Sequence, residues 1–215
     1  TKCRIEDDLY RLLDILKDAD QLLLIAPVYV LSIPGKLKLL IDRFLAISSY
    51  FSDRPAQPTV SIGIAALPDW HQFQLPLMNI MLLGLGRVIV DSFILYGAGP
   101  GEILIHPEIT RVQQVVKGLI QYEPKPYESQ VSKHCPIDFC TLFERIEGDQ
   151  YRCPVCLTPA RAVKDGFYFD AKDLNNHRWT QENIKKHFVE WILQTKPRFM
   201  SMLKQIIKRK KELEL

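Results

Sequence analysis

The chain has 215 residues, of which 47% are hydrophobic and 25% charged, and this suits one globular domain with a small additional segment. Its net charge of +3 is too small to argue for a nucleic-acid partner. No apolar run reaches the roughly 18 residues that a membrane-spanning helix needs, and the polar first residues do not form a signal peptide, so we expect a cytoplasmic protein.

The first half of the sequence alternates between helix and strand patterns. Apolar residues at helical spacing predict helices, and continuous apolar or β-branched runs predict buried strands. Alternation of this kind is typical of an α/β domain with a parallel sheet. In chain order we expect a helix at 5–17, a strand at 22–26, a helix at 34–47, a strand at 59–67, a helix at 73–85, a strand at 87–97 and a helix at 108–120.

The first predicted strand leads into a candidate ligand site. Leu22–Ile25 is apolar at every position, which is typical of a parallel strand that is covered on both faces. Pro27 then ends the ladder because it has no N–H to donate, and a helix follows Gly35. Loops at the carboxyl ends of parallel strands are where ligands bind in open α/β sheets.

This region resembles the flavodoxin-like NAD(P)H-dependent FMN reductases and iron–sulfur flavoproteins. The resemblance extends with weaker echoes to about Leu119. It implies a flavin-dependent oxidoreductase that passes electrons from NADH or NADPH through FMN to an unknown acceptor. The shared pattern is Asp-Asp at 7–8, Ala-Asp at 19–20, Pro-Val-Tyr at 27–29, Gly at 35, Leu-Lys at 37–38 and Ile-Asp-Arg at 41–43.

By this resemblance, two loops would lie against the flavin ring. The second loop, 66–70, departs from the family, which often has glycines there; Trp70 either stacks on the flavin or caps the core. The glycines of 97–101 resemble the family's third loop. No catalytic residue is assigned, because hydride transfer to a flavin requires no acid or base side chain. The ring contacts implied are Ala26, Pro27, Val28, Tyr29 and Gly35 from the first loop, and Leu67, Asp69 and Trp70 from the second.

The resemblance also implies that the natural polypeptide begins before Thr1. In flavodoxin-like sheets of order 2-1-3-4-5, the strand at 22–26 would be the third, and the first strand with its phosphate-binding loop would lie upstream. Two such strand–helix units are roughly 60 residues. Without them we expect no bound FMN, because the phosphate anchor is lost. Cys3 is either a simple thiol or the end of an iron–sulfur motif.

The composition changes near residue 121, which predicts four parts. We expect a partial flavodoxin-like domain at 1–121 that lacks its N-terminal strand–loop–helix, and a proline-containing linker at 122–133. A small zinc-ribbon-like subdomain at 134–170 and C-terminal helices at 171–215 complete the chain.

Four cysteines predict a metal site in the ribbon. Cys135, Cys140, Cys153 and Cys156 form the pattern C-x4-C-x12-C-x2-C, and both halves have the pair spacing of a four-thiolate zinc site. "GDQ" between the halves suggests a hairpin. Iron is less favoured, because rubredoxin iron usually takes two C-x2-C pairs followed by glycine. An odd cysteine total and the lack of a secretion signal argue against disulfides. A four-ligand site would be structural.

The tail predicts two helices that need a partner. Thr180 is a plausible N-cap for the first, and Thr195 with Pro197 begins the second. Packing back on the sheet domain is the default, and a homo-oligomer contact is the alternative. The alternative to the enzyme is a non-catalytic or electron-transfer module that uses a flavodoxin-like scaffold and a metal ribbon to dock a partner protein. The apolar positions are Phe188, Trp191, Ile192, Phe199, Met202, Leu203 and Ile206.

Overall fold

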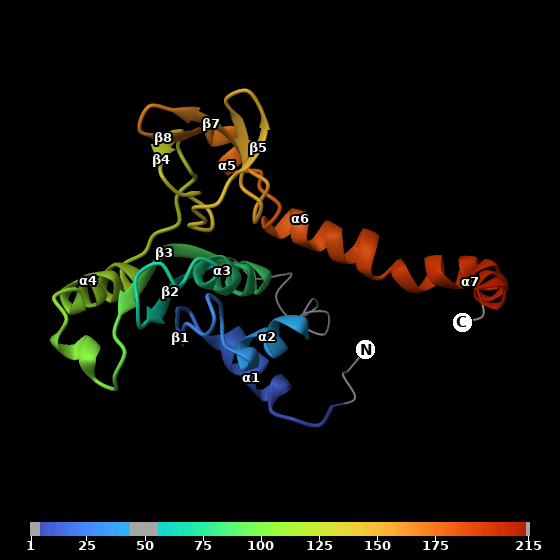
Figure 1. The fold of residues 1–215 in the computed structure, drawn as a ribbon, viewed down its shortest axis with the longest axis horizontal. Helices are drawn as coiled ribbons and strands as arrows, with labels where there is room; N and C mark the ends of the chain where they lie inside the picture. Colours follow the sequence, from blue (N-terminus) through green and yellow to red (C-terminus); the bar gives the residue numbers. More distant parts are fainter. Residues whose placement is uncertain (1–4, 44–55, 214–215) are drawn as a thin grey trace.

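A computed structural model describes residues 5–43 and 56–213 of the chain. Cys3 and the end of the helix predicted at 34–47 lie outside these residues. The described parts form a parallel sheet with helices on both faces, an antiparallel ribbon above it and a helical arm (Figure 1). Within these ranges no helix combines the length and the apolar character needed to cross a bilayer.

The parallel sheet has three strands in the order β1-β2-β3. These are β1 (Leu22–Pro27), β2 (Gln57–Ala65) and β3 (Arg87–Tyr96). In register, Ile25 lies beside Ile62 of β2, and Ile62 lies beside Phe93 of β3. All three strands point the same way, so their carboxyl ends meet at one edge. The predicted α/β class is confirmed.

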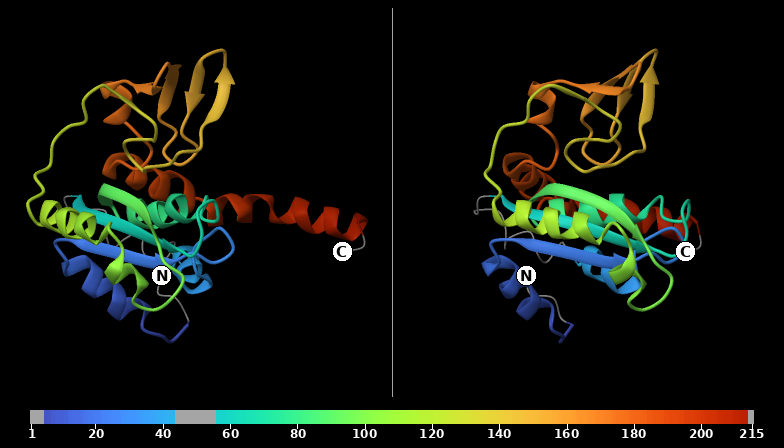
Figure 2. Two further views of the ribbon diagram at one scale, coloured as in Figure 1. Left: turned by 60° about the vertical axis from the view of Figure 1, so that its left-hand side comes forward. Right: turned by 90° about the vertical axis from the view of Figure 1, so that its left-hand side faces the viewer.

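Helices cover the two faces of the sheet unequally. On one face lie α1 (Leu9–Asp18), α2 (Gly35–Asp42) and α3 (Gln74–Gly84), whose apolar residues pack together and against β1. The other face is covered by α4 (Ile109–Ile120), which follows a short 3-10 turn, η2 (Glu102–Ile105), and packs on β2 and β3 (Figure 2).

β1 is an edge strand with one exposed face. Ala26 is buried, and Leu22 and Leu24 are partly buried under the helices of the first face. On the opposite face, the side chains of Leu23 and Ile25 are 36% and 51% exposed. This face of β1 is not covered by α4, because α4 packs on residues of β2 and β3. The prediction that Leu22–Ile25 is covered on both faces is therefore wrong for the part of the chain described.

The cysteine-rich segment forms a five-stranded antiparallel sheet of order β4-β8-β7-β6-β5. The hairpin predicted at "GDQ" is present between β5 and β6, where Gly148 adopts a φ of +54°. β4 lies inside the stretch predicted as a linker, so the ribbon begins earlier than residue 134. The strands are β4 (Gln130–Ser132), β5 (Glu144–Glu147), β6 (Gln150–Arg152), β7 (Pro159–Val163) and β8 (Gly166–Phe169).

The ribbon shares a hydrophobic core with the sheet. Leu82 and Leu83 of α3 and Ile89 of β3 belong to the same buried cluster as Ile137 and the ribbon cysteines. At the other end of the ribbon, the indole N–H of Trp179 donates to the carbonyl of Val155 at 2.9 Å. The ribbon is thus packed onto the sheet domain and is not a free appendage.

A buried polar network crosses this interface. Asn79 of α3 is fully buried; its amide group donates to the Asp138 carbonyl at 2.6 Å and to the Ser92 hydroxyl at 2.9 Å. Its side-chain oxygen accepts from the Ser61 hydroxyl at 2.6 Å, and the two serine hydroxyls lie 2.7 Å apart. One side chain therefore joins β2, β3 and the ribbon.

The C-terminal helices form an arm. After α5 (Ala171–Leu174), the arm consists of α6 (Gln181–Lys186), the π-helical η3 (His187–Ile192) and α7 (Thr195–Glu212). The Thr180 hydroxyl accepts from the Asn183 N–H at 3.2 Å, so the predicted N-cap is present. α7 projects away from the body (Figure 2), and the default expectation that it packs back on the sheet domain is wrong.

Replacement of Asn79 by alanine should lower the free energy of unfolding by about 2–4 kcal/mol, because the Asp138 carbonyl loses its donor inside the core. Urea unfolding followed by circular dichroism measures this change. The control is Asn176→Ala at an exposed asparagine, which should change the value by less than about 0.5 kcal/mol. Equal effects of the two variants would contradict the assigned role of Asn79.

Candidate functional site

Three loops gather at the carboxyl edge of the parallel sheet. They follow the ends of β1, β2 and β3 and span 28–34, 66–73 and 97–101. Backbone hydrogen bonds extend the strand pairing into them: Val28 N–H donates to the Ile64 carbonyl at 2.8 Å, and Gly97 N–H donates to the Ala65 carbonyl at 2.9 Å. The ends of the three loops are therefore held at fixed relative positions.

The first loop contains a tight turn in a strained conformation. Tyr29 and Ser32 exchange both backbone hydrogen bonds, at 2.8 and 3.1 Å, around Val30 and Leu31. Val30 has a φ of 49° and Leu31 a φ of 67°. Left-handed values at both central positions define the turn type that favours Asn-Gly, and a β-branched residue there is an outlier. Strain of this kind is concentrated at functional sites.

The start of α3 ties the first two loops together. Phe73 N–H donates to the Leu31 carbonyl at 3.0 Å. The buried Gln74 amide donates to the carbonyls of Ala26 at 3.1 Å and Pro27 at 3.3 Å. α3 approaches β2 closely here, since a Cβ added to Gly63 would lie 2.9 Å from the Gln74 side chain.

Large side chains form an exposed rim around these loops. The exposed fractions are 62% for Tyr29, 58% for Leu67 and 60% for Trp70. Trp70 therefore does not cap the core of the described chain. Asp69 has a φ of 63°, and the space beside Gly35 is open. These residues fit the flat apolar wall that a flavin ring requires.

The structure thus places the eight predicted ring residues at one edge of the sheet. Ala26 differs from the rest, because its side chain is buried and its carbonyl accepts from Gln74. It supports the loop from below. The sequence could not distinguish Ala26 from its neighbours, because its role depends on a partner 48 residues away.

The third loop is already occupied by a carboxylate. Glu102 accepts hydrogen bonds from the N–H groups of Ala98 at 2.7 Å and Gly99 at 2.8 Å. The bonds from Gly99 and Ala98 lower the pKa of Glu102. A phosphate group could take these donors only by displacing Glu102, so this loop suits a ring edge better than a phosphate.

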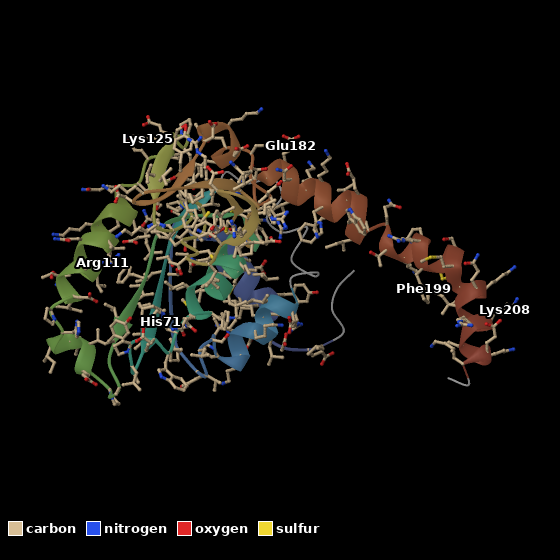
Figure 3. All side chains as sticks on the ribbon, turned by 45° about the horizontal axis from the view of Figure 1, so that its top comes forward. His71, Arg111, Lys125, Glu182, Phe199 and Lys208 are labelled. Atoms are coloured by element: carbon tan, nitrogen blue, oxygen red, sulfur yellow. The ribbon has the colours of Figure 1, made fainter. Side chains whose placement is uncertain are left out.

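Sequence reasoning missed a polar pair in the rim. The Tyr96 hydroxyl lies 3.0 Å from Nε2 of His71, and the two rings meet edge to face (Figure 3 labels His71). Burial raises the pKa of Tyr96, with Asp69 adding to the effect. The only available signal was that Tyr96 lies near the end of one predicted strand and His71 lies in the loop after another. The pair can hold a proton at the rim.

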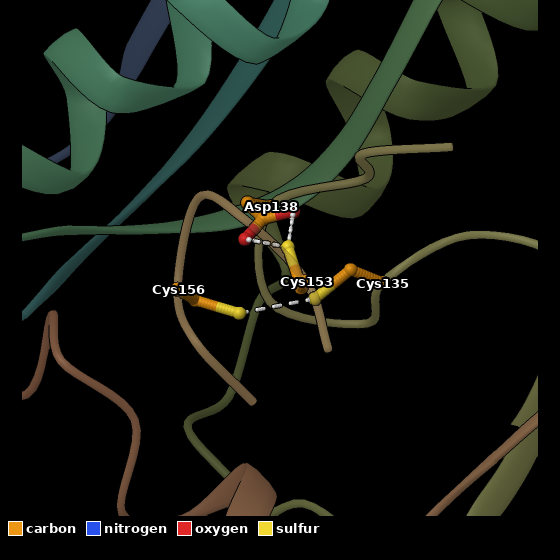
Figure 4. Close-up of side chains that lie close together, drawn as sticks. All are labelled: Cys135, Asp138, Cys153 and Cys156. Atoms are coloured by element: carbon orange, nitrogen blue, oxygen red, sulfur yellow. Dashed lines mark hydrogen bonds between the residues drawn. The ribbon is translucent and has the colours of Figure 1, made fainter. Parts of the chain in front are cut away.

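The ribbon cysteines form a second candidate site. The ligand atoms of Cys135, Asp138, Cys153 and Cys156 all lie within 4.8 Å of one another, and all four residues are buried (Figure 4). The Cys135 and Cys156 sulfurs are 3.3 Å apart, and the Cys153 sulfur is 3.2 Å from a carboxylate oxygen of Asp138. This group shares Cys135, Cys153 and Cys156 with the predicted four-cysteine set and contains Asp138 in place of Cys140.

Cys140 lies at the edge of this group, and its thiol contacts the thiol of Cys153. Its sulfur points to the Leu142 carbonyl at 3.5 Å, and its backbone N–H donates to Oδ1 of Asp138 at 3.0 Å. All four predicted cysteines are free thiols, so the disulfide alternative is wrong. Asp138 was missed because carboxylates are common in sequences and the cysteine spacing already supplied four ligands.

Burial makes the separate ionisation of these groups costly. Burial raises the pKa of Cys135, whereas hydrogen bonds from three neighbouring thiols lower the pKa of Cys153. Burial, with the charge of Cys153 adding to it, raises the pKa of Asp138 to about 7. A bound cation offsets this cost because it favours the deprotonated form of every ligand.

These features define a flavodoxin-like α/β protein with a ribbon that carries a candidate metal site. Residues 1–95 match the family model of the NADPH-dependent FMN reductases. The resemblance inferred from the Pro-Val-Tyr loop is thereby confirmed.

Two relatives extend the comparison beyond the family segment. The chain is 26% identical over 214 residues to flavone synthase cfoJ of Aspergillus candidus, with 85% of this chain covered. It spans 66% of that relative's length. A solved structure described as a flavone reductase matches 99% of this chain and 83% of its own, with a TM-score of 0.70 and 18% identity. The fold match therefore includes the ribbon and the arm.

The double replacement Val30→Asn with Leu31→Gly should raise the free energy of unfolding by about 1–2 kcal/mol, since both residues tolerate the left-handed conformation. Urea unfolding is the measurement. Ile105→Asn, which removes a similarly exposed apolar side chain from η2, should change stability by less than about 0.5 kcal/mol. A loss of stability in the double variant would mean that contacts of Val30 and Leu31 outweigh the backbone strain.

Proposed function

We propose that this chain is part of an NAD(P)H-dependent flavin oxidoreductase whose FMN ring lies on the rim formed by Tyr29, Leu67 and Trp70. The observation that carries the proposal is this exposed aromatic rim, held by hydrogen-bonded loops, inside a segment that matches the FMN reductase family model. When bound, FMN would accept a hydride from the nicotinamide cofactor and deliver electrons to an acceptor.

Some residues at the rim would contact the flavin ring, and others hold the loops in position. Tyr29 and Trp70 offer flat faces for a ring, and the open space beside Gly35 leaves room for it. Gln74 fixes the end of β1 from beneath, so the loop backbone is positioned before a ligand arrives. The occupied Glu102 site directs a phosphate elsewhere.

For the acceptor we propose a flavone-class compound. The two relatives that cover most of the chain are named for flavone synthesis and flavone reduction, which are one two-electron step run in opposite directions. Reduction would add a hydride and a proton across the carbon–carbon double bond of the flavone and oxidise one NAD(P)H. The Tyr96–His71 pair is placed to hold that proton.

The ribbon supports this reading over a separate docking module. The hydrophobic core of the ribbon is continuous with α3 and β3, so the ribbon is packed against the sheet domain as part of one folded unit. We propose one structural zinc ion in it, because a segment of about 40 residues usually needs a metal or disulfides to fold. The free thiols also agree with a reducing, cytoplasmic location.

The full natural polypeptide should quench flavin fluorescence when it is incubated with FMN, and anaerobic NADPH should then bleach the visible flavin absorbance. Trp70→Ala should weaken FMN binding by roughly tenfold, because one aromatic contact contributes about 1–1.5 kcal/mol. The control Trp191→Ala removes an exposed tryptophan on the arm and should leave FMN binding unchanged. Protein that takes up no FMN would refute the enzyme proposal.

The acceptor is tested in the same anaerobic cell. Flavone added to the reduced protein should restore the flavin absorbance, and the product should carry two additional hydrogens by mass spectrometry. If flavone leaves the flavin reduced and is recovered unchanged, and the flavin is reoxidised only when air is admitted, the flavone assignment is refuted and the flavin proposal stands.

We also propose that the arm contacts a second copy of the chain. An amphipathic helix of this length needs tertiary packing in water, yet Phe199 and Met200 are 46% and 56% exposed (Figure 3). Trp191, Phe199 and Met202 line one groove of about 480 Å³ at the bend between η3 and α7. A self-complementary contact between two arms would bury it.

Light scattering should therefore give twice the chain mass of 24.9 kDa. Phe199→Glu should shift the protein to the monomer, because it places a charge in the proposed contact, while Lys210→Gln on the same helix should not. A monomeric parent protein would contradict the arm contact.

A further inference from the structure

Two turns of the ribbon have related sequences. "CPIDFC" occupies 135–140 and "CPVCLT" occupies 153–158. Both begin with Cys-Pro followed by a β-branched residue. When the turns are aligned, Asp138 takes the place of Cys156, and Cys140 takes the place of Thr158.

The backbones repeat in the same way. In the first turn, Phe139 N–H donates to the Cys135 carbonyl at 2.8 Å, and in the second, Leu157 N–H donates to the Cys153 carbonyl at 2.9 Å. The fifth residues have left-handed φ values of 56° for Phe139 and 62° for Leu157. Each turn is thus a knuckle that presents its first and fourth side chains to one point.

A second backbone bond closes each knuckle. Cys135 N–H donates to the Cys140 carbonyl at 2.9 Å, and Cys153 N–H donates to the Thr158 carbonyl at 3.0 Å. The sixth residue of each turn therefore holds the knuckle shut and also touches the fourth. Cys140 N–H bonds the Asp138 carboxylate at 3.0 Å, and the Thr158 hydroxyl lies 3.0 Å from the Cys156 sulfur.

We infer that the ribbon binds zinc through Cys135, Asp138, Cys153 and Cys156, with Cys140 outside the ligand set. The inference deepens the proposed structural zinc and does not depend on flavin binding. The four donor atoms already lie within 4.8 Å of one another. A tetrahedral zinc with Zn–S bonds of about 2.3 Å places its ligand atoms roughly 3.5–3.8 Å apart, so small shifts suffice.

The donor set suits zinc chemically. Carboxylate oxygen is a normal zinc ligand beside cysteine sulfur, and the charge of three thiolates and one carboxylate equals that of four thiolates. Cys140 then has the role that outer hydrogen-bond donors have in metal sites: its N–H orients the Asp138 carboxylate. The same N–H would have no ligand to orient if Asp138 were outside the set.

Metal content of the full chain, measured by inductively coupled plasma mass spectrometry, tests the ligand set. The parent protein and Cys140→Ser should both carry one equivalent of zinc. Asp138→Asn should lose zinc to a competing chelator with an affinity reduced by more than about tenfold. Because Asp138→Asn could fail to fold, a gain-of-ligand variant is included.

That variant is Asp138→Cys, which copies the second knuckle. After exchange of Zn²⁺ for Co²⁺, the sulfur-to-metal charge-transfer band should have equal intensity in the parent and in Cys140→Ser, and should increase by about one third in Asp138→Cys. This ratio follows from three thiolate ligands becoming four.

The opposite pattern would overturn the inference. Loss of zinc from Cys140→Ser with retention in Asp138→Asn would restore the four-cysteine set, as would equal Co²⁺ bands in the parent and Asp138→Cys. A metal-free, folded parent protein would remove the site altogether. Flavin uptake is measured separately, so its failure would refute the proposed enzyme and not the ligand set.

Discussion

The amide of Asn79 is the interaction on which the relative placement of the two sheets depends. It sits in the middle of α3, and its partners come from β2, β3 and the backbone of the first knuckle. Leu82 and Ile137 belong to the apolar cluster at the same interface, and apolar contacts have no directional preference. The polar network fixes one orientation, because any other would leave several buried groups without partners.

The same helix also connects the two candidate sites. Gln74, in the first turn of α3, holds the carbonyls at the end of β1, and Asn79 lies between one and two turns further along. A change at the ribbon that moved Asp138 would therefore act on the element that supports the Tyr29 loop. α3 is short and packed on both sides, so it would move as a rigid unit.

The sequence predicted the elements that depend on local patterns. Continuous apolar runs predicted β2 and β3, Thr180 predicted the start of α6, and "GDQ" predicted the β5–β6 hairpin. Features that depend on distant partners were not predictable in this way. The exposure of Ile25, the Tyr96–His71 pair and the inclusion of Asp138 all follow from how elements meet in space. Cysteine spacing alone favoured Cys140, since it reports ligand type and not knuckle geometry.

The shared core can be completed only after the ribbon has been synthesised. Asn79 and the Asp138 carbonyl that it binds are separated by 59 positions, so at translation rates of about 5–20 residues per second the helix leaves the ribosome several seconds before its cover. During that interval Leu82, Leu83 and the amide of Asn79 face water on a nearly complete sheet domain. The nascent chain therefore passes through a state in which this apolar surface of α3 is exposed. In that state chaperones can bind the surface and the chain can aggregate, and folding of the ribbon over α3 ends both.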